Sequence, residues 1–208
     1  MQVLLVHGLG RTPLSLVGLA LDLRRSGHRP RLLGYVGALE RYDAIVRRVR
    51  RRLEGIAGAR MPYAAIGHSL GGLMLRAALA EWPETLPAPK CVVLLGTPSR
   101  PPRLALRFQR SLLYRWINGE AGQLLAQPEY FASLPAPTVP LTIVAGTKRW
   151  PRRLSLFADE PNDGVVAVAE TRLDPPGITQ EVAASHTFMM NNRQVRTLVR
   201  ETLARAGG

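Results

Sequence analysis

The sequence has little cysteine and no long hydrophobic run, and each shortage excludes a class of protein. Cys91 is the single cysteine among 208 residues, which excludes an internal disulfide and any multi-cysteine metal site. It stands in the apolar run "KCVVLLG", so we expect a buried strand residue and not a catalytic thiol. No apolar run approaches the roughly 20 residues that a membrane-spanning helix needs. The amino terminus, "MQVLLVHG", enters a strand pattern without a charged leader, and we therefore expect a cytoplasmic protein.

Acidic residues are also scarce. The 15 Asp and Glu residues face 28 Lys and Arg residues, which gives a net charge of +13. Such a balance favours anionic partners such as nucleic acid or anionic lipid. The basic residues are nevertheless spread along the chain, with runs at 47–52 and 148–153, and no nucleic-acid-binding motif accompanies them. We expect solvated helix faces and no specific nucleic acid, with docking to an anionic surface as the alternative.

Short apolar runs alternate with helical patterns from one end of the chain to the other. The helical pattern at 42–53, for example, repeats apolar residues at three- and four-residue steps. Continuous apolar runs between helices predict an α/β fold, in which a mostly parallel sheet carries helices on both faces. With no internal repeat or linker, we expect a single domain over residues 1–208. The predicted strands are 3–6, 29–36, 63–67, 91–96 and 141–146.

The stretch "YAAIGHSLGGLMLRAALA" places a serine between a strand and a helix. In a turn this sharp, the residues two before and two after the serine must be small, and Gly67 and Gly71 are. The turn would expose the Ser69 hydroxyl at the carboxyl end of the sheet. The backbone N–H of Leu70, at the helix N-terminus, would face a developing oxyanion. The pattern therefore predicts that Ser69 is a nucleophile.

A serine nucleophile needs a base, and the chain offers four histidines. His68 adjoins Ser69 but should point away and pack or hydrogen-bond locally. His28 lies in a turn and is expected to be exposed, and His7 is expected to be structural. His186, in "VAASHTFM", follows the last strand-like run, and a loop at that place can reach the serine. We predict His186 as the base.

The base in turn needs a carboxylate that orients it. Three acids follow the strand at 141–146, in "FADEPNDGVV". Asp163 lies in an Asn-Asp-Gly turn that gives its side chain a defined direction, and we predict it as the acid. Asp159 is the second choice, and Glu160 has the character of a solvated loop residue. No cluster of His, Cys and Asp has metal-ligand spacing, so we expect no metal and no cofactor.

The order Ser69, Asp163, His186 is that of the α/β-hydrolase triad. The sequence resembles small α/β-hydrolases of the bacterial lipase and esterase kind. This resemblance implies a minimal form of the fold, without its first two strands and with a short cap insertion. It also implies that Leu9 supplies the second oxyanion N–H beside Leu70. The matching pieces are "VLLVHGLG" at 3–10, "GHSLGG" at 67–72, "LGTP" at 95–98, "NDGVV" at 162–166 and "SHTFM" at 185–189.

We therefore expect a serine hydrolase that cleaves a small-molecule carboxylic ester through an acyl-enzyme. A thioesterase or an acyltransferase would use the same triad and is the alternative. An alternative of another class is a basic binding protein on a hydrolase scaffold. Ester chain length, alcohol half and oligomeric state have no signal in the sequence.

Residues 99–138 form a stretch longer than an ordinary crossover, with proline at both ends. It is either a crossover helix with extended loops or a small cap over the site. If it is helical, Arg103, Arg107 and Arg110 share a face, and we hypothesise that they contact anionic phospholipid. Its apolar residues fit an acyl pocket or a helix core; they are Leu104, Leu106, Phe108, Leu112, Leu113 and Trp116.

Overall fold

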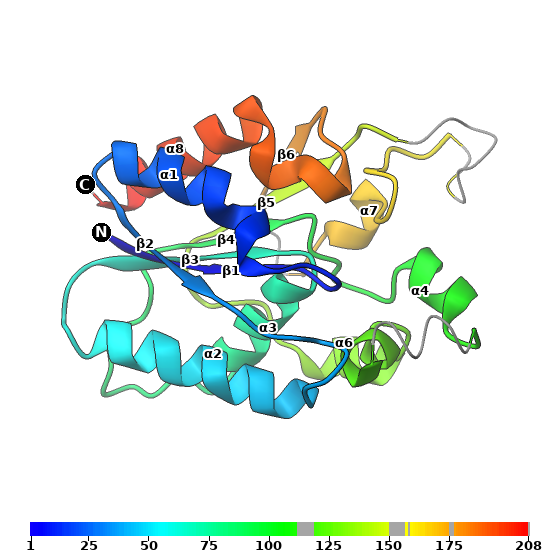
Figure 1. The fold of residues 1–208 in the computed structure, drawn as a ribbon, viewed down its shortest axis with the longest axis horizontal. Helices are drawn as coiled ribbons and strands as arrows, with labels where there is room; N and C mark the ends of the chain where they lie inside the picture. Colours follow the sequence, from blue (N-terminus) through cyan, green and yellow to red (C-terminus); the bar gives the residue numbers. More distant parts are fainter. Residues whose placement is uncertain (112–118, 150–156, 158, 175–176, 208) are drawn as a thin grey trace.

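The computed structural model describes residues 1–111, 119–149, 157, 159–174 and 177–207. Within them, six strands form one sheet in the order β2-β1-β3-β4-β5-β6, and every pairing is parallel (Figure 1). The predicted α/β class with a mostly parallel sheet is confirmed. The strands are β1 Gln2–Val6, β2 Arg29–Leu33, β3 Tyr63–His68, β4 Val92–Leu95, β5 Leu141–Gly146 and β6 Ile178–Val182.

Helices cover both faces of this sheet. On one face lie α1 (Val17–Arg25) and α8 (Arg193–Gly207), and on the other lie α2 (Tyr42–Ala57) and α3 (Leu70–Leu79) (Figure 1). Successive strand side chains point to opposite faces, so β1 contributes to both cores. Its residues Val3 and Leu5 pack with α1 and α8, whereas Leu4 and Val6 pack with α2 and α3. Because both faces of β1 are buried, its sequence is a nearly continuous run of apolar residues.

The order of the strands indicates where on the molecule a ligand would bind. All carboxyl ends of the parallel strands meet at that edge, where α4 (Arg103–Phe108), α6 (Pro128–Ser133) and α7 (Val168–Thr171) also lie (Figure 1). The chain continues from β1 to β2 on one side and from β3 to β4 on the other. Ligands of open parallel sheets bind where the strand order reverses in this way. Two 3₁₀ helices, η1 (Pro13–Leu16) and η3 (His186–Asn191), flank the same edge.

The segment 99–138 contributes α4, a helical stretch over 119–124 and α6 to this edge. Leu112, Leu113 and Trp116, which we assigned to an acyl pocket or a helix core, lie outside the described residues. The neighbouring Leu106 and Phe108 are 40% and 42% exposed, so they belong to no core. That the segment acts as a cap stays a prediction.

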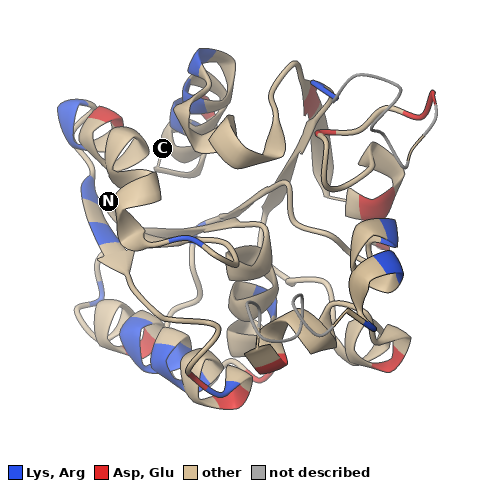
Figure 2. Ribbon diagram, turned by 45° about the vertical axis from the view of Figure 1, so that its right-hand side comes forward, with Lys and Arg blue, Asp and Glu red and all other residues tan. Residues whose placement is uncertain are grey.

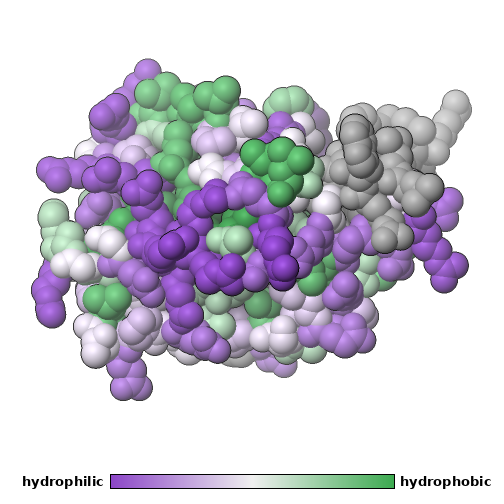
Figure 3. Space-filling model, turned by 60° about the horizontal axis from the view of Figure 1, so that its bottom comes forward, coloured by the Kyte–Doolittle hydropathy of each residue, from purple (hydrophilic) through white to green (hydrophobic). Residues whose placement is uncertain are grey.

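The positive charge is distributed over many elements, as the sequence indicates. Basic residues mark α1, α2, α4 and α8 on different sides of the molecule (Figure 2). Exposed arginines on α2 make the surface mostly hydrophilic when the molecule is viewed from that side (Figure 3). Part of the basic run at 148–153 lies outside the described residues. The exposed arginines of α2 are Arg47, Arg48, Arg51 and Arg52.

Cys91 is 2% exposed, so its predicted burial is confirmed, but it lies directly before β4 and not within the strand. It packs in the core between the sheet and α8. Burial raises the pKa of its thiol to about 11, so the reactive thiolate is suppressed. In the part of the chain that the structure describes, no helix combines the length and the apolar character needed to cross a membrane.

The turn from β3 into α3 is closely packed against neighbouring backbone. A Cβ atom on Gly67 would lie 2.5 Å from the Gly72 Cα atom. A Cβ atom on Gly71 would lie 2.8 Å from the carbonyl carbon of Val6 and closer still to its oxygen. Backbone atoms of a central strand cannot move away cheaply, so only glycine fits at either position.

We therefore expect Gly71→Ala to lower the free energy of unfolding by about 3 kcal/mol, the upper part of the usual range for overpacking. Gly55→Ala on α2 is the matched control, because a Cβ atom there meets nothing within 4 Å. This control should gain about 0.5–1 kcal/mol from helix propensity. Urea unfolding of both variants measures the difference, and equal stabilities would contradict this view of the turn.

Candidate active site

Ser69 has a strained backbone at the junction of β3 and α3. Its φ of 52° and ψ of −122° lie outside the regions that residues with a side chain favour. The surroundings hold this conformation: the Ser69 N–H donates to the Leu95 carbonyl at 2.8 Å. The Ser69 carbonyl accepts hydrogen bonds from the Gly72 N–H at 2.9 Å and from the Thr97 hydroxyl at 3.1 Å. Strain that is held so firmly is typical of functional sites.

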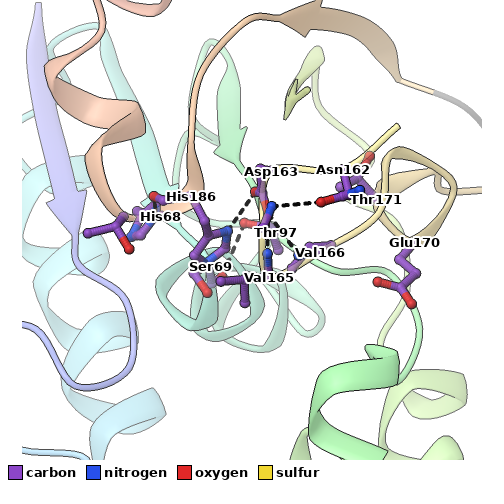
Figure 4. Close-up of polar contacts among 12 residues, drawn as sticks. His68, Ser69, Thr97, Asn162, Asp163, Val165, Val166, Glu170, Thr171 and His186 are labelled. Carbon is purple, nitrogen blue, oxygen red and sulfur yellow. Dashed lines mark hydrogen bonds and ion pairs between the residues drawn. The ribbon is translucent and has the colours of Figure 1, made fainter. Parts of the chain in front are cut away.

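The structure brings His186 and Asp163 to the same place. Nδ1 of His186 donates to Oδ2 of Asp163 at 2.6 Å, and both residues are nearly buried, at 8% and 1% exposure. This bond occupies Nδ1 and leaves Nε2 as the acceptor nitrogen of the neutral ring. Figure 4 shows the His186 ring between Ser69 and Asp163. Among the described residues, no hydrogen-bond partner occupies the Ser69 hydroxyl or His186 Nε2.

The Asp163 carboxylate is oriented by its own loop. Oδ1 accepts the N–H of Val165 at 2.9 Å and the N–H of Val166 at 2.7 Å, which leaves Oδ2 for His186. The preceding Asn162 closes the turn by accepting the Gly164 N–H at 3.0 Å. Gly164 has a φ of +96°, a conformation that glycine adopts without strain. The Asn-Asp-Gly turn thus gives the acid the defined direction that the sequence indicates.

Two backbone N–H groups beside Ser69 have no hydrogen-bond acceptor in the described part of the chain. Neither Leu9 nor Leu70 donates its N–H to any acceptor among the described residues, and Leu9 lines the same cleft as the serine. The loop that carries Leu9 is fixed by His7, whose Nδ1 donates to the Gly8 carbonyl at 2.9 Å. Tyr35 stacks on the His7 ring at 4.1 Å and donates its hydroxyl to the His7 carbonyl at 2.8 Å. His7 is therefore structural, as expected.

His68 differs from our expectation. It does not bond locally: Nε2 donates to the carbonyl of His186 at 3.0 Å, across 118 positions of sequence. Burial is the main cause that holds the pKa of His68 well below its ordinary value, with the proximity of His186 as the second cause, so the His68 ring is neutral. His68 thereby ties the backbone of the predicted base to the strand that ends at the predicted nucleophile. His28, expected to be exposed, is half-buried with Nδ1 3.5 Å from the amino terminus.

Two glycines that the sequence pattern did not single out make room for Asp163 and His186. A Cβ atom on Gly96 would lie 3.0 Å from His186 Nδ1, and one on Gly146 would lie 2.6 Å from the Cβ atom of Asp163. Both glycines end apolar strands, "VVLLG" and "LTIVAG", at the carboxyl edge of the sheet. A glycine directly after a buried parallel strand is the signal that would have found them.

A cleft of about 250 Å³ opens above Ser69 and His186. A wider groove of about 510 Å³ runs between β2 and α2, but Ser69 does not line it. Arg11, which sequence reasoning did not select, also lines the cleft above the serine. The apolar wall of that cleft consists of Leu9, Pro98, Pro102, Leu104, Ala105, Leu125, Val165 and Val166.

The remaining acids of this region have other partners. Asp159, the second choice for the acid, lies 3.5 Å from Arg149 and is largely exposed. Glu160 is not a solvated loop residue, because it pairs with Arg103. Arg103 also bonds the buried Glu170, with Nε 3.2 Å from its carboxylate. Among the described residues, no three His, Cys, Asp or Glu side chains gather as metal ligands would.

The ion pairs of Arg103 bear on the hypothesis that three arginines of this segment contact anionic phospholipid. Arg103 is committed to two glutamates of its own chain, whereas Arg107 and Arg110 are exposed. Arg110 also lies beyond the end of α4 at Phe108, so the three arginines do not share one helical face, and contact of Arg107 and Arg110 with lipid headgroups stays a prediction.

The fold and the arrangement around Ser69 are those of an α/β-hydrolase. The profile of the family described as "Alpha/beta hydrolase family" matches residues 3–207, and the chain belongs to this family. No curated protein sequence matches the chain.

Solved structures of the same fold span several activities. A lipase of Bacillus licheniformis, BlEst2, is similar with a TM-score of 0.74 and 17% identity, over 97% of this chain and 91% of that one. The RedJ thioesterase of the prodiginine pathway in Streptomyces coelicolor has a TM-score of 0.67 and 15% identity, over 99% and 90%. Phospholipase PlaB of Legionella pneumophila has a TM-score of 0.65 and 17% identity, over 83% of this chain and 46% of that one.

The buried neutral histidines predict how stability depends on pH. Burial lowers the pKa of both His68 and His7, so the unfolded chain binds protons at pH values where the folded chain does not. The free energy of unfolding should fall as the pH drops below about 6.5, by up to about 1.4 kcal/mol per pH unit for each histidine. Urea unfolding between pH 8 and pH 5 measures this slope, and His68→Gln should flatten it. A stability that rises towards pH 5 would contradict the assignment.

Proposed function

We propose that the protein is a serine hydrolase that cleaves carboxylic esters through an acyl-enzyme, with Ser69 as nucleophile, His186 as base and Asp163 as acid. The observation that carries the proposal is a combination of two features in one cleft. Ser69 has a strained backbone and a hydroxyl without a hydrogen-bond partner among the described residues, and His186 bonds Asp163 at 2.6 Å. Each part has a structural use, but together they match the requirements of nucleophilic catalysis.

In the first step, His186 Nε2 takes the proton of the Ser69 hydroxyl while the oxygen attacks the ester carbonyl carbon. The N–H groups of Leu9 and Leu70 hold the oxyanion that forms. Asp163 stabilises the imidazolium without being protonated. As the tetrahedral intermediate collapses, His186 gives the proton to the departing alcohol and the acyl group remains on Ser69. Water, activated by His186, then attacks the acyl-enzyme and releases the acid.

The same machinery would serve a thioesterase or an acyltransferase. The structural neighbours include proteins named as a lipase, a thioesterase and a phospholipase, all at low identity. We favour an ester of modest size, because the cleft of about 250 Å³ lies below the range of about 300–1,000 Å³ that is usual for drug-sized ligands.

The first test is a series of p-nitrophenyl esters with acyl chains of two to sixteen carbons. Wild type should hydrolyse the short esters best, and Ser69→Ala should lose about 10⁴-fold or more in kcat. A Ser69→Ala variant with wild-type turnover would refute the nucleophile. If wild type cleaves matched thioesters but no oxygen ester, the thioesterase alternative holds instead.

A second test separates the two candidate acids. Asp163→Asn should lower kcat by about 10⁴-fold, because the amide favours the wrong tautomer of the base. Asp159→Asn is the matched control, since Asp159 is exposed and lies beside Arg149, and its kcat should match that of wild type. Steady-state rates on a short ester decide between them, and the reverse pattern would move the acid to Asp159.

A binding protein on a hydrolase scaffold is the proposal of another class. It predicts no hydrolysis of any ester or thioester, together with a salt-sensitive shift of nucleic acid. The strained serine disfavours this reading, because a binding surface gains nothing from holding Ser69 in that conformation.

A further inference from the structure

The proposed ester cleft contains one permanently charged side chain, that of Arg11. The other residues that line the cleft are apolar or carry uncharged polar groups, apart from the two histidines, His68 and His186. Arg11 lies in the loop between β1 and η1 and is half-buried. Its Nη2 donates to the backbone carbonyl of Thr187 at 3.0 Å. In the described part of the chain, no carboxylate pairs with it.

Some arginines of the chain have carboxylate partners, whereas the buried Arg76 is bonded, among the described residues, to backbone carbonyls. Arg103 pairs with Glu160 and Glu170, and Arg200 pairs with Asp22 at 2.6 Å. A guanidinium presents five N–H donors in a planar fork, and Arg11 uses one nitrogen on a backbone carbonyl. A partly desolvated cation in a cleft is costly unless it meets an anion. A ligand that brings the anion would complete the site.

The position of Arg11 relative to the base shows which half of an ester it would meet. The base must protonate the departing group, so that group lies beside His186 Nε2. Arg11 is bonded to Thr187, the residue that directly follows His186. The guanidinium is therefore tethered to the segment that carries the predicted base, which favours the leaving-group side of the reacting carbonyl for the anion that it would bind. The apolar side chains of α4, such as Leu104 and Ala105, come from a different part of the fold and suit an acyl group.

We propose that Arg11 binds an anionic group, a carboxylate or a phosphate, on the leaving-group half of the substrate. The protein would then prefer esters that combine an uncharged apolar acyl chain with an anionic alcohol. This inference rests on the proposed ester hydrolysis and adds the substrate class to it. Guanidinium groups bind both kinds of anion through paired, charge-assisted hydrogen bonds.

A purely structural role for Arg11 makes a different prediction. If the guanidinium only braces the loop after His186, its loss should slow the hydrolysis of every ester by the same factor. If it binds substrate, its loss should change the ratio between anionic and neutral substrates. The ratio is therefore the readout that separates the two roles.

The experiment compares two esters of nearly equal size, 4-carboxyphenyl butyrate and 4-carbamoylphenyl butyrate. Wild type should have the higher kcat/KM for the carboxylate ester. Arg11→Gln should lower the carboxylate-to-amide ratio by about tenfold or more, the usual value of a hydrogen bond to a charged group. Arg11→Lys should retain part of the preference, because it keeps the charge without the fork. Arg107→Gln, which removes an exposed arginine of α4 outside the cleft lining, is the matched control and should leave the ratio unchanged.

Two further esters refine the assignment. A 4-phosphonophenyl butyrate that is preferred over the carboxylate ester would identify a phosphate-type group as the natural anion. A p-nitrophenyl hemisuccinate places the charge on the acyl half instead. An Arg11-dependent preference for this ester over p-nitrophenyl butyrate would overturn the leaving-group assignment.

Failure of this inference can be told apart from failure of the proposed function. If wild type cleaves both butyrates and Arg11→Gln has the same carboxylate-to-amide ratio of kcat/KM as wild type, the role of Arg11 is refuted and the proposed hydrolysis stands. Wild type that cleaves no ester refutes the proposed ester hydrolysis. In that case calorimetry on Ser69→Ala still tests Arg11: tighter binding of the carboxylate ester that is lost in Ser69→Ala/Arg11→Gln supports it, and equal binding overturns it.

Discussion

The sharp turn at Ser69 is the constraint on which the rest of the site depends. A residue with a side chain is held there at a φ of 52°, and this is possible only because backbone fits against backbone on both sides. Gly67 lies against Gly72, and Gly71 lies against the end of β1. The turn thereby joins three parts of the fold: the central strand β3, the helix α3 and the strand β1. The loop with Leu9 and Arg11 continues directly from β1, so the same contact positions the predicted oxyanion donors relative to the serine.

The predicted base and the predicted acid are attached to this turn by a second set of contacts. His68, the neighbour of Ser69, holds the carbonyl of His186, while Asp163 holds its ring. The Asp163 loop is itself closed by backbone N–H groups. His186 is therefore held at its ring and at its backbone, and Asp163 is held by its own loop and by His186. Pre-organisation of a catalytic site requires such fixed side chains. The two buried neutral histidines contribute to this order at neutral pH and oppose it in acid.

Much of this arrangement could be predicted from the sequence, because it follows from local patterns. Apolar runs with helical spacers indicate the parallel sheet, and the Gly-x-Ser-x-Gly turn together with the order of Ser69, Asp163 and His186 indicates the family. The contacts that were missed are all tertiary. The bond from His68 to His186 joins residues far apart in sequence, and the commitment of Arg103 to two glutamates depends on how α4 packs. Arg11 is part of none of the matched sequence pieces, and only the folded cleft shows that it has no carboxylate partner among the described residues.

The most direct measurement of the central claim is covalent labelling of the intact protein with a fluorophosphonate, followed by peptide mass spectrometry. We expect a single phosphonylated residue, Ser69, with labelling slowed strongly in Asp163→Asn and absent in Ser69→Ala. Labelling at another residue, or none in a folded protein, would contradict the assignment of Ser69 as an activated nucleophile.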